Sequence, residues 1–240
     1  DDERDLFPEA LRLVSEIQPR AVLLENVKGL LSDRFAEYRS RLEMELQRLG
    51  YTGQWRLLNA SSFGVPQLRP RAFLVAFRTQ DADRFEWPEE APNTAPAVGE
   101  TLVDLMASEG WVGAKAWARR ADSIGPTLVG GSKKHGGPDL GPTRAKRAWA
   151  ELGVNGKLIG NAPPASDFPE DGDPYLTVRM AARVQGFPDS WAITGRKTNA
   201  SRQVGNALPP PVATALGRQI ASVLSPAAVI REPEIEWSEA

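Results

Sequence analysis

The feature that most constrains this chain is a regular pattern that is interrupted and then resumes. Helical and strand-like periodicities alternate over residues 5–78, degrade from about residue 79 into a stretch rich in proline and glycine, and return at Thr177. An α/β layout that carries an irregular insert accounts for this order. The chain is therefore predicted to be of the α/β class, with a separate small domain inside it.

The first segment is predicted to hold two helices and three strands. Leu6, Leu13 and Ile17 recur at helical spacing, and Pro19 ends that helix. The other expected elements are a strand at 21–24, a helix at 32–49 closed by Gly50, and strands at 54–59 and 71–78. The loop between the last two strands is too short for a crossover helix, so these strands should pair antiparallel.

The short run from Ala21 to Leu24 is apolar throughout and ends in Glu25 and Asn26. This pattern is typical of a buried parallel strand, whose carboxyl end faces the ligand in open α/β sheets. A carboxylate in that position is costly unless it is paired. Glu25 is therefore either a structural partner of an arginine or a residue of a functional site.

The last part of the chain is predicted to be helical. One helix should span 177–185, capped by Thr177, and a second should run from Pro209–Pro211 to about Leu224. We divide the chain at 1–78, 79–175, 176–225 and an acidic tail at 226–240. The chain begins with Asp1 and enters a helical pattern at once, which suggests a fragment or a processed chain.

Composition excludes several kinds of protein. The chain is 41% hydrophobic, enough for a real core, but no apolar run approaches the roughly 20 residues of a membrane span, so a cytoplasmic location without a membrane partner is expected. The sequence has no cysteine and the single histidine His135, so disulfides, thiolate metal sites and a thiol nucleophile are excluded and no metal site is expected.

Basic residues are concentrated in one segment although the net charge is only -2. Residues 115–149 carry eight basic side chains against the two acids Asp122 and Asp139. The basic residues are Lys115, Arg119, Arg120, Lys133, Lys134, Arg144, Lys146 and Arg147. This segment is the predicted place for contact with an anionic partner.

Two further clusters could carry chemistry. Arg69 and Arg71 stand at alternate positions, so in an extended segment they would project to one side and could hold a phosphate, a carboxylate or a polar base edge. Surface ion pairing is the alternative. Gly205 and Asn206 precede three prolines, and this turn could present backbone amides at a helix start to a polar ligand.

Four motifs in this order resemble the later motifs of the DNA cytosine-5 methyltransferase family. They are Glu25-Asn26-Val27, the Gln-x-Arg-x-Arg of Gln67 to Arg71, Arg183-Val184-Gln185-Gly186-Phe187-Pro188, and Gly205-Asn206-Ala207-Leu208-Pro209. The resemblance spans residues 1–224, with a variable insert between the second and third motifs. It implies part of a Rossmann-like methyltransferase sheet with a small target-recognition domain.

The resemblance implies roles for individual residues. Glu25 matches the glutamate that contacts N3 of a flipped cytosine and helps to protonate it, a role that burial would favour. Arg71 matches the arginine that binds the base near O2, and Arg69 the one that helps to organise the catalytic loop. For the cofactor, S-adenosylmethionine, the family implies contacts from Leu6, Asn206 and Ala207.

The chain departs from the family at its nucleophile. In the family a cysteine in a Pro-Cys loop precedes the first helix seen here, and a Gly-rich cofactor loop lies earlier still; neither is in this sequence. Without a thiolate no covalent adduct forms, so the chain alone is expected to be inactive. Its sheet should expose an apolar edge, which predicts association with the N-terminal half of the enzyme.

The insert corresponds to the family's target-recognition domain. Its basic and glycine-rich composition suits phosphates and groove edges, so double-stranded DNA is the expected partner, contacted by Lys133, Lys134, Arg144, Lys146 and Arg147. A solvated loop is the alternative. The length of the insert favours DNA over RNA as substrate. Two functions stay open: part of a restriction-modification methyltransferase, or a catalytically dead paralogue that binds DNA or regulates an active enzyme.

Overall fold

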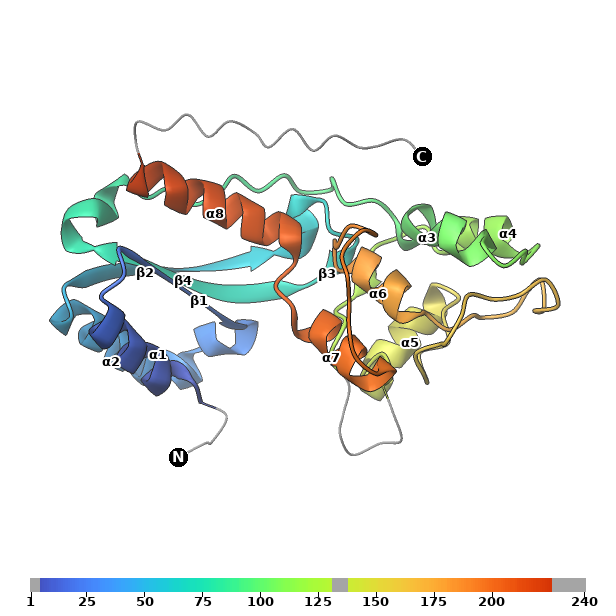
Figure 1. Ribbon diagram of the computed structural model, residues 1–240, viewed down its shortest axis with the longest axis horizontal. Helices are drawn as coiled ribbons and strands as arrows, with labels where there is room; N and C mark the ends of the chain where they lie inside the picture. The colour runs from blue at the N-terminus through green and yellow to red at the C-terminus, as the bar shows by residue number, and fades with distance from the viewer. Residues whose placement is uncertain (1–4, 131–137, 226–240) are drawn as a thin grey trace. The chain divides into compact units, whose positions relative to one another are not determined.

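A computed structural model describes residues 5–130 and 138–225 (Figure 1). The chain divides into two compact units. The first comprises residues 1–56, 72–88 and 214–240, and the second comprises residues 57–71 and 89–213. These boundaries differ from the expected divisions at 78 and 176, because residues 57–71 and 176–213 belong to the same unit as the insert. The assignment of each segment to a catalytic or recognition domain stays a prediction.

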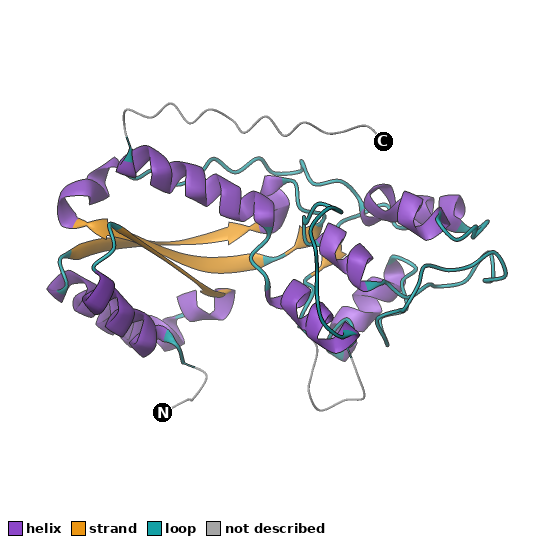
Figure 2. Ribbon diagram, in the orientation of Figure 1, coloured by secondary structure: helices purple, strands orange, loops and turns teal. Residues whose placement is uncertain are grey.

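A three-stranded sheet of order β1-β4-β2 forms the centre of the first unit, and Figure 2 shows its long strands. Helices α1 and α2 pack on one face and the C-terminal part of α8 on the other (Figure 1). The apolar stripe of α1 and α2 is buried against the sheet through Val14 and Leu46. The elements are α1 (Phe7–Ile17), β1 (Ala21–Val27), α2 (Ala36–Arg48), β2 (Tyr51–Asn59), β4 (Pro70–Arg78) and α8 (Pro210–Leu224).

Hydrogen bonds at the strand ends fix the strand directions. The amide of Thr79 donates to the carbonyl of Gly50, and the amide of Ala60 donates to that of Arg69, so β2 and β4 run antiparallel, as expected. The amide of Arg78 donates to the carbonyl of Arg20, which brings the end of β4 beside the start of β1. β1 therefore also runs antiparallel to β4.

The expectation that β1 is a buried parallel strand is wrong for the described residues. β1 is an end strand of the sheet, and its alternate residues are exposed, with Leu23 at 37% and Val27 at 57%. The fully buried strand is β4, from Ala72 to Phe77, because it lies between β1 and β2 and is covered on both faces.

The second unit is mostly helical. Its core buries three tryptophans, Trp111, Trp117 and Trp149, each at most 2% exposed, with Leu102, Met106 and other apolar side chains. Its elements are β3 (Gln67–Leu68), α3 (Val98–Ala107), α4 (Ala114–Arg120), β5 (Gly125–Pro126), α5 (Thr143–Glu151), α6 (Val178–Val184) and α7 (Lys197–Asn206). The short strands β3 and β5 pair in parallel, so the Gln-x-Arg-x-Arg segment is joined to the insert.

The helices α3, α4 and α5 lie in the insert, where no regular structure was expected. Each has only seven to ten residues and is bounded by glycine or proline loops, so the helical periodicity is too short to stand out. The predicted helices at 5–17, 32–49, 177–185 and 210–224 are confirmed with small shifts at their ends. The α/β class is also confirmed.

Within the described ranges, no helix is long and apolar enough to cross a membrane. The same residues contain no group of three or more histidine or acidic side chains that could hold a metal ion. His135 lies outside the described residues.

Candidate active site

One pocket of the first unit brings together two predicted site residues. It has a volume of about 770 Å³ and lies between the start of α1 and the end of β1, with the following turn and α2. Both Leu6 and Glu25 line it. Its apolar wall is formed mainly by Leu6, Phe7, Ala10, Leu24, Leu30 and Phe35. The volume and the mainly apolar wall are those of a typical small-molecule site.

Polar groups at one end of this pocket are held in place by hydrogen bonds. The Tyr38 hydroxyl donates to Oδ2 of Asp5 at 2.6 Å, and the amide of Phe7 donates to Oδ1 of the same carboxylate at 3.1 Å. Partial burial, followed by the hydrogen bond to Asp5, raises the pKa of the Tyr38 phenol. Tyr38 is therefore a neutral donor that fixes Asp5 at the start of α1.

The pocket fits the type of cofactor that the sequence implies. S-adenosylmethionine combines a flat adenine ring, ribose hydroxyls and a positively charged sulfonium. The apolar wall around Leu6 and Phe7 suits the ring, and the carboxylate of Asp5 suits hydroxyl donors and positive charge. Leu6 is 71% exposed and lies at the N-cap of α1, so its side chain is accessible for such a contact.

Glu25 is not buried, contrary to expectation. It lies near the end of β1 and is exposed in the described part of the chain. The neighbouring Asn26 side chain accepts a hydrogen bond from the amide of Val27 at 2.8 Å, which fixes the turn after the strand.

The two arginines of the Gln-x-Arg-x-Arg motif have different environments. Arg69 is 2% exposed, and its guanidinium donates to the carbonyls of Leu128, Gly205 and Ala207 at 2.7, 2.9 and 3.1 Å. These main-chain contacts differ from the ligand holding and the surface ion pairing considered for the pair, and the role in organising the catalytic loop that the resemblance implies for Arg69 stays a prediction. Arg71 is half-buried, and its Nη1 donates to the carbonyl of Pro70 at 2.9 Å.

The Gly205-Asn206 segment also differs from its prediction. This segment ends α7 instead of starting a helix, so it presents carbonyls and not amides. Arg69 donates to the carbonyls of Gly205 and of the following Ala207. Gly205 is buried, whereas Asn206 is exposed and Ala207 is half-buried. Asn206 and Ala207 belong to the second unit, and Leu6 and Glu25 to the first.

Two glutamines escaped the sequence analysis although they lie inside its motifs. Gln67 and Gln185 are both 0% exposed and hydrogen-bond each other at 2.6 Å, from Nε2 of Gln67 to Oε1 of Gln185. They are separated by 118 positions, so sequence spacing gives no sign of the pair. The motifs contain both glutamines, but nothing in the sequence indicates that the two side chains pair.

The predicted DNA contacts of the insert fall partly on α5. Arg144 and Arg147 are exposed and three residues apart, so they lie on the same side of this helix. Lys146 instead forms an ion pair with Asp139 at 2.6 Å and is only partly exposed. Lys133 and Lys134 lie outside the described residues.

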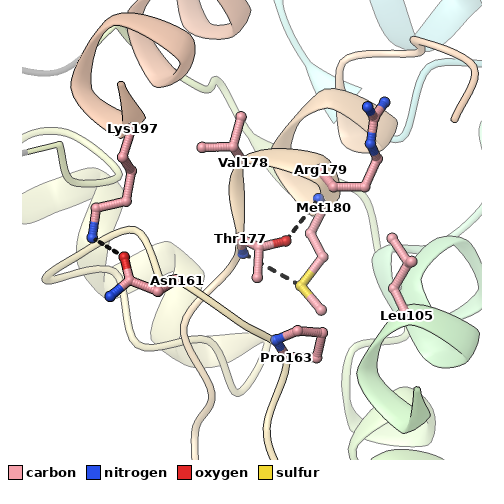
Figure 3. A pocket seen from close by; sticks show the side chains of 9 residues that line it. Leu105, Asn161, Pro163, Thr177, Val178, Arg179, Met180 and Lys197 are labelled. Carbon is pink, nitrogen blue, oxygen red and sulfur yellow. Dashed lines mark hydrogen bonds between the residues drawn. The ribbon is translucent and has the colours of Figure 1, made fainter. Parts of the chain in front are cut away.

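A second pocket, of about 400 Å³, lies in the second unit beside the start of α6 (Figure 3). Lys197 at its edge donates to Oδ1 of Asn161 at 2.8 Å and to the carbonyl of Ile159 at 3.0 Å. Arg179 donates to the carbonyls of Pro188 and Trp191. These cations serve to hold main-chain segments together, and we assign the pocket no ligand.

Comparison with known proteins identifies the family. Residues 1–222 match the family described as C-5 cytosine-specific DNA methylase. The chain is 55% identical over 226 residues to the Type II methyltransferase M.NaeI of Lentzea aerocolonigenes, covering 94% of this chain and 54% of that protein. It is 47% identical over 227 residues to M.NgoMIV of Neisseria gonorrhoeae, covering 93% of this chain and 71% of that protein. The chain thus spans about half the length of M.NaeI.

Solved structures share the fold. The methyltransferase EhMeth of Entamoeba histolytica superimposes with a TM-score of 0.56 at 14% identity, covering 94% of this chain and 69% of that chain. A DNMT2 variant of Spodoptera frugiperda gives a TM-score of 0.55 at 14% identity, covering 92% and 72%. The likeness confirms the Rossmann-like methyltransferase architecture. The family match over residues 1–222 establishes that the chain belongs to the C-5 cytosine-specific DNA methylases.

Proposed function

We propose that this chain supplies the base-holding and DNA-reading parts of a DNA cytosine-5 methyltransferase of a restriction-modification system. The observation that carries the proposal is the pocket of about 770 Å³ that Leu6 and Glu25 share, in a chain whose family match covers residues 1–222. The relatives named as Type II methyltransferases support the restriction-modification assignment.

In the proposed reaction, Glu25 acts on the flipped cytosine as a general acid. Its carboxyl donates a proton to N3, which withdraws electron density from C6, the atom that the nucleophile attacks. Arg71 holds the base by donating toward O2, and base extrusion allows both groups to reach a base that is stacked in the duplex. S-adenosylmethionine, when bound, supplies the methyl group.

The covalent step requires a thiolate that this sequence does not contain, since it has no cysteine. We propose that a second segment, with the Pro-Cys loop and the Gly-rich cofactor loop, completes the enzyme. The exposed apolar side chains of the first unit support this idea. On α1, Leu13 is 41% and Ile17 is 69% exposed. On the end strand β1, Leu23 is 37% and Val27 is 57% exposed. Burial of Glu25 would then come from the added segment.

For the DNA, we propose that Arg144 and Arg147 of α5 contact the duplex, together with Lys133 and Lys134. Lys146 contributes less, because its ammonium is already paired with Asp139. The competing function is a catalytically dead paralogue that binds DNA. The presence of Glu25, Arg69, Arg71 and Asn206 in one chain favours the enzyme.

The test is methyl transfer from labelled S-adenosylmethionine to mixed-sequence duplex DNA. The chain is assayed alone and with the segment that carries the Pro-Cys and Gly-rich loops. We expect activity only with both, and we expect Glu25→Gln to abolish methylation while DNA binding persists. DNA binding without methylation in the complete mixture would support the dead paralogue instead.

A further inference from the structure

Three buried polar side chains of the second unit, those of Gln67, Arg69 and Gln185, form a closed ring with the main chain of Leu128 and Ala207. The amide of Leu128 donates to Oε1 of Gln67 at 2.7 Å, and Nε2 of Gln67 donates to Oε1 of Gln185 at 2.6 Å. Nε2 of Gln185 donates to the carbonyl of Ala207 at 2.6 Å. Arg69 closes the ring, because it donates to the carbonyls of both Ala207 and Leu128.

The ring holds two segments of main chain, at Leu128 and at Ala207. Leu128 is held through its amide by Gln67 and through its carbonyl by Arg69, so this residue cannot rotate without breaking one of the bonds. The carbonyl of Ala207 accepts from both Gln185 and Arg69. Each glutamine amide has one orientation that satisfies its partners, so the direction of the ring is defined.

The two segments also touch directly. A Cβ atom placed on Gly205 would lie 2.4 Å from the carbonyl carbon of Val129 and 2.5 Å from the amide nitrogen of Gly130. Side chains are thus excluded at this contact, and the end of α7 lies against the backbone that follows Leu128. Because Gln67 and Gln185 are 0% exposed, water cannot replace a broken bond in the ring without rearrangement.

We infer that Gln67 and Gln185 are positioning residues that make the insert backbone at Leu128–Gly130 and the Gly205–Ala207 segment move as one body. The inference rests on the proposed function, in which the insert contacts DNA and the Gly205–Ala207 segment serves the cofactor. In these terms the ring couples the two binding events, so that occupation of one site favours the geometry of the other.

A purely structural role would make a different prediction. Loss of a structural hydrogen bond lowers the melting temperature, but it leaves the ratio of DNA affinities with and without cofactor product unchanged in molecules that remain folded. Coupling predicts that this ratio falls toward one. Known couplings between sites typically amount to about 5-fold to 150-fold in affinity.

The experiment uses the chain together with the segment that carries the Pro-Cys and Gly-rich loops. The dissociation constant for duplex DNA is measured with and without saturating S-adenosylhomocysteine, at a temperature where circular dichroism shows every variant folded. The variants are Gln185→Met and the double variant Gln67→Met with Gln185→Met, in which apolar side chains of similar length replace both partners and limit the loss of stability. Gln47→Met, at an exposed position of α2, is the control.

We expect the wild type and Gln47→Met to bind DNA at least about 5-fold more tightly with S-adenosylhomocysteine. Both ring variants should show a ratio near one while they still bind DNA. A wild-type ratio of one, or an unchanged ratio in the ring variants, would overturn the inference and leave the proposed function intact. A wild-type mixture that binds neither DNA nor S-adenosylhomocysteine would overturn both.

Discussion

At Gly205 the backbone of α7 passes too close to another segment for any side chain to fit. The nearest neighbours of a Cβ at this position would be backbone atoms of Val129 and Gly130, at 2.4 to 2.5 Å, and backbone cannot move aside as a flexible side chain can. This glycine is needed for close approach and not for a left-handed backbone conformation, because its φ is not positive. The contact brings Arg69 within reach of the Gly205 carbonyl.

Replacement of Gly205 by alanine should therefore destabilise the protein by about 3 kcal/mol or more, since overpacking against backbone must displace a segment. Calorimetry should show the melting temperature lowered by roughly 6–12 °C. The matched control is Gly217→Ala in α8, where a Cβ meets nothing within 4 Å and removal of a helical glycine should stabilise by about 0.5–1 kcal/mol. Equal effects of the two substitutions would contradict the packing argument.

Single residues differ in how far the sequence revealed them. The resemblance to the family pointed to Glu25 and Leu6, and both residues line one pocket, although their roles stay a prediction. The partners of Arg69 could not be found in this way, because the carbonyls that it binds lie 59 to 138 positions away and carry no side-chain signature. Burial of Glu25 was predicted from the apolar run before it, but that run turned out to form an end strand.

Among the elements, α6 is capped at its start and linked to α3 near its end. Thr177 caps it by accepting from the amide of Met180, and the Met180 sulfur accepts from the amide of Thr177 (Figure 3). Near the other end, Arg183 binds Asp104 of α3 and also Asp189. The sequence predicted the cap at Thr177, but α3 was not expected, so this link could not be foreseen.

The Asp104 link predicts a pH dependence. Partial burial alone would raise the pKa of Asp104, but hydrogen bonds from Arg183 and from the Leu105 amide outweigh it and hold the pKa below its usual value. The ionised carboxylate therefore stabilises the fold at pH values above its pKa in the unfolded chain, near 3.8. This contribution is lost as the pH falls through the lower pKa of the folded state. Since Asp104 is 63% exposed, the contribution is below about 1 kcal/mol.

Urea titrations of the wild type and Asp104→Asn should thus show the largest difference in free energy of unfolding at pH 7. The difference should shrink between about pH 5 and pH 2. Glu109→Gln, at an exposed position beyond the end of α3, serves as the control and should give a smaller difference at neutral pH. A difference for Asp104→Asn that grows toward acid pH would reverse the assigned sign.

As a whole molecule, the protein consists of two units, each with a buried core of its own. The α/β class and the presence of an insert followed from periodicity alone. The grouping of residues 57–71 with the insert did not, because it depends on the parallel pairing of β3 with β5, which are only two residues long. Strands of this length leave no pattern in a sequence.

The proposed association with a segment that carries the Pro-Cys loop predicts what charged residues on the exposed face of α1 will do. A double variant Leu13→Glu with Ile17→Glu should change the stability of the chain by less than about 1 kcal/mol, because both side chains are already substantially exposed. The double variant should no longer co-purify with the segment that carries the Pro-Cys loop, and the mixture of the two should no longer methylate DNA. Val112→Glu, at a position 69% exposed in the second unit, should retain both. Retention of both by the α1 variant would place the association elsewhere.

The close approach at Gly130 has a consequence for how such enzymes diversify. The backbone before residues 131–137 is fixed against the end of α7, and just after them the Pro138 carbonyl accepts from the amide of Ile159 at 2.9 Å. Both attachments are made by main-chain atoms of described residues. Exchange of exposed side chains elsewhere in the insert therefore leaves these two attachments and the buried ring intact, and under the proposed function a new DNA preference arises without a new fold.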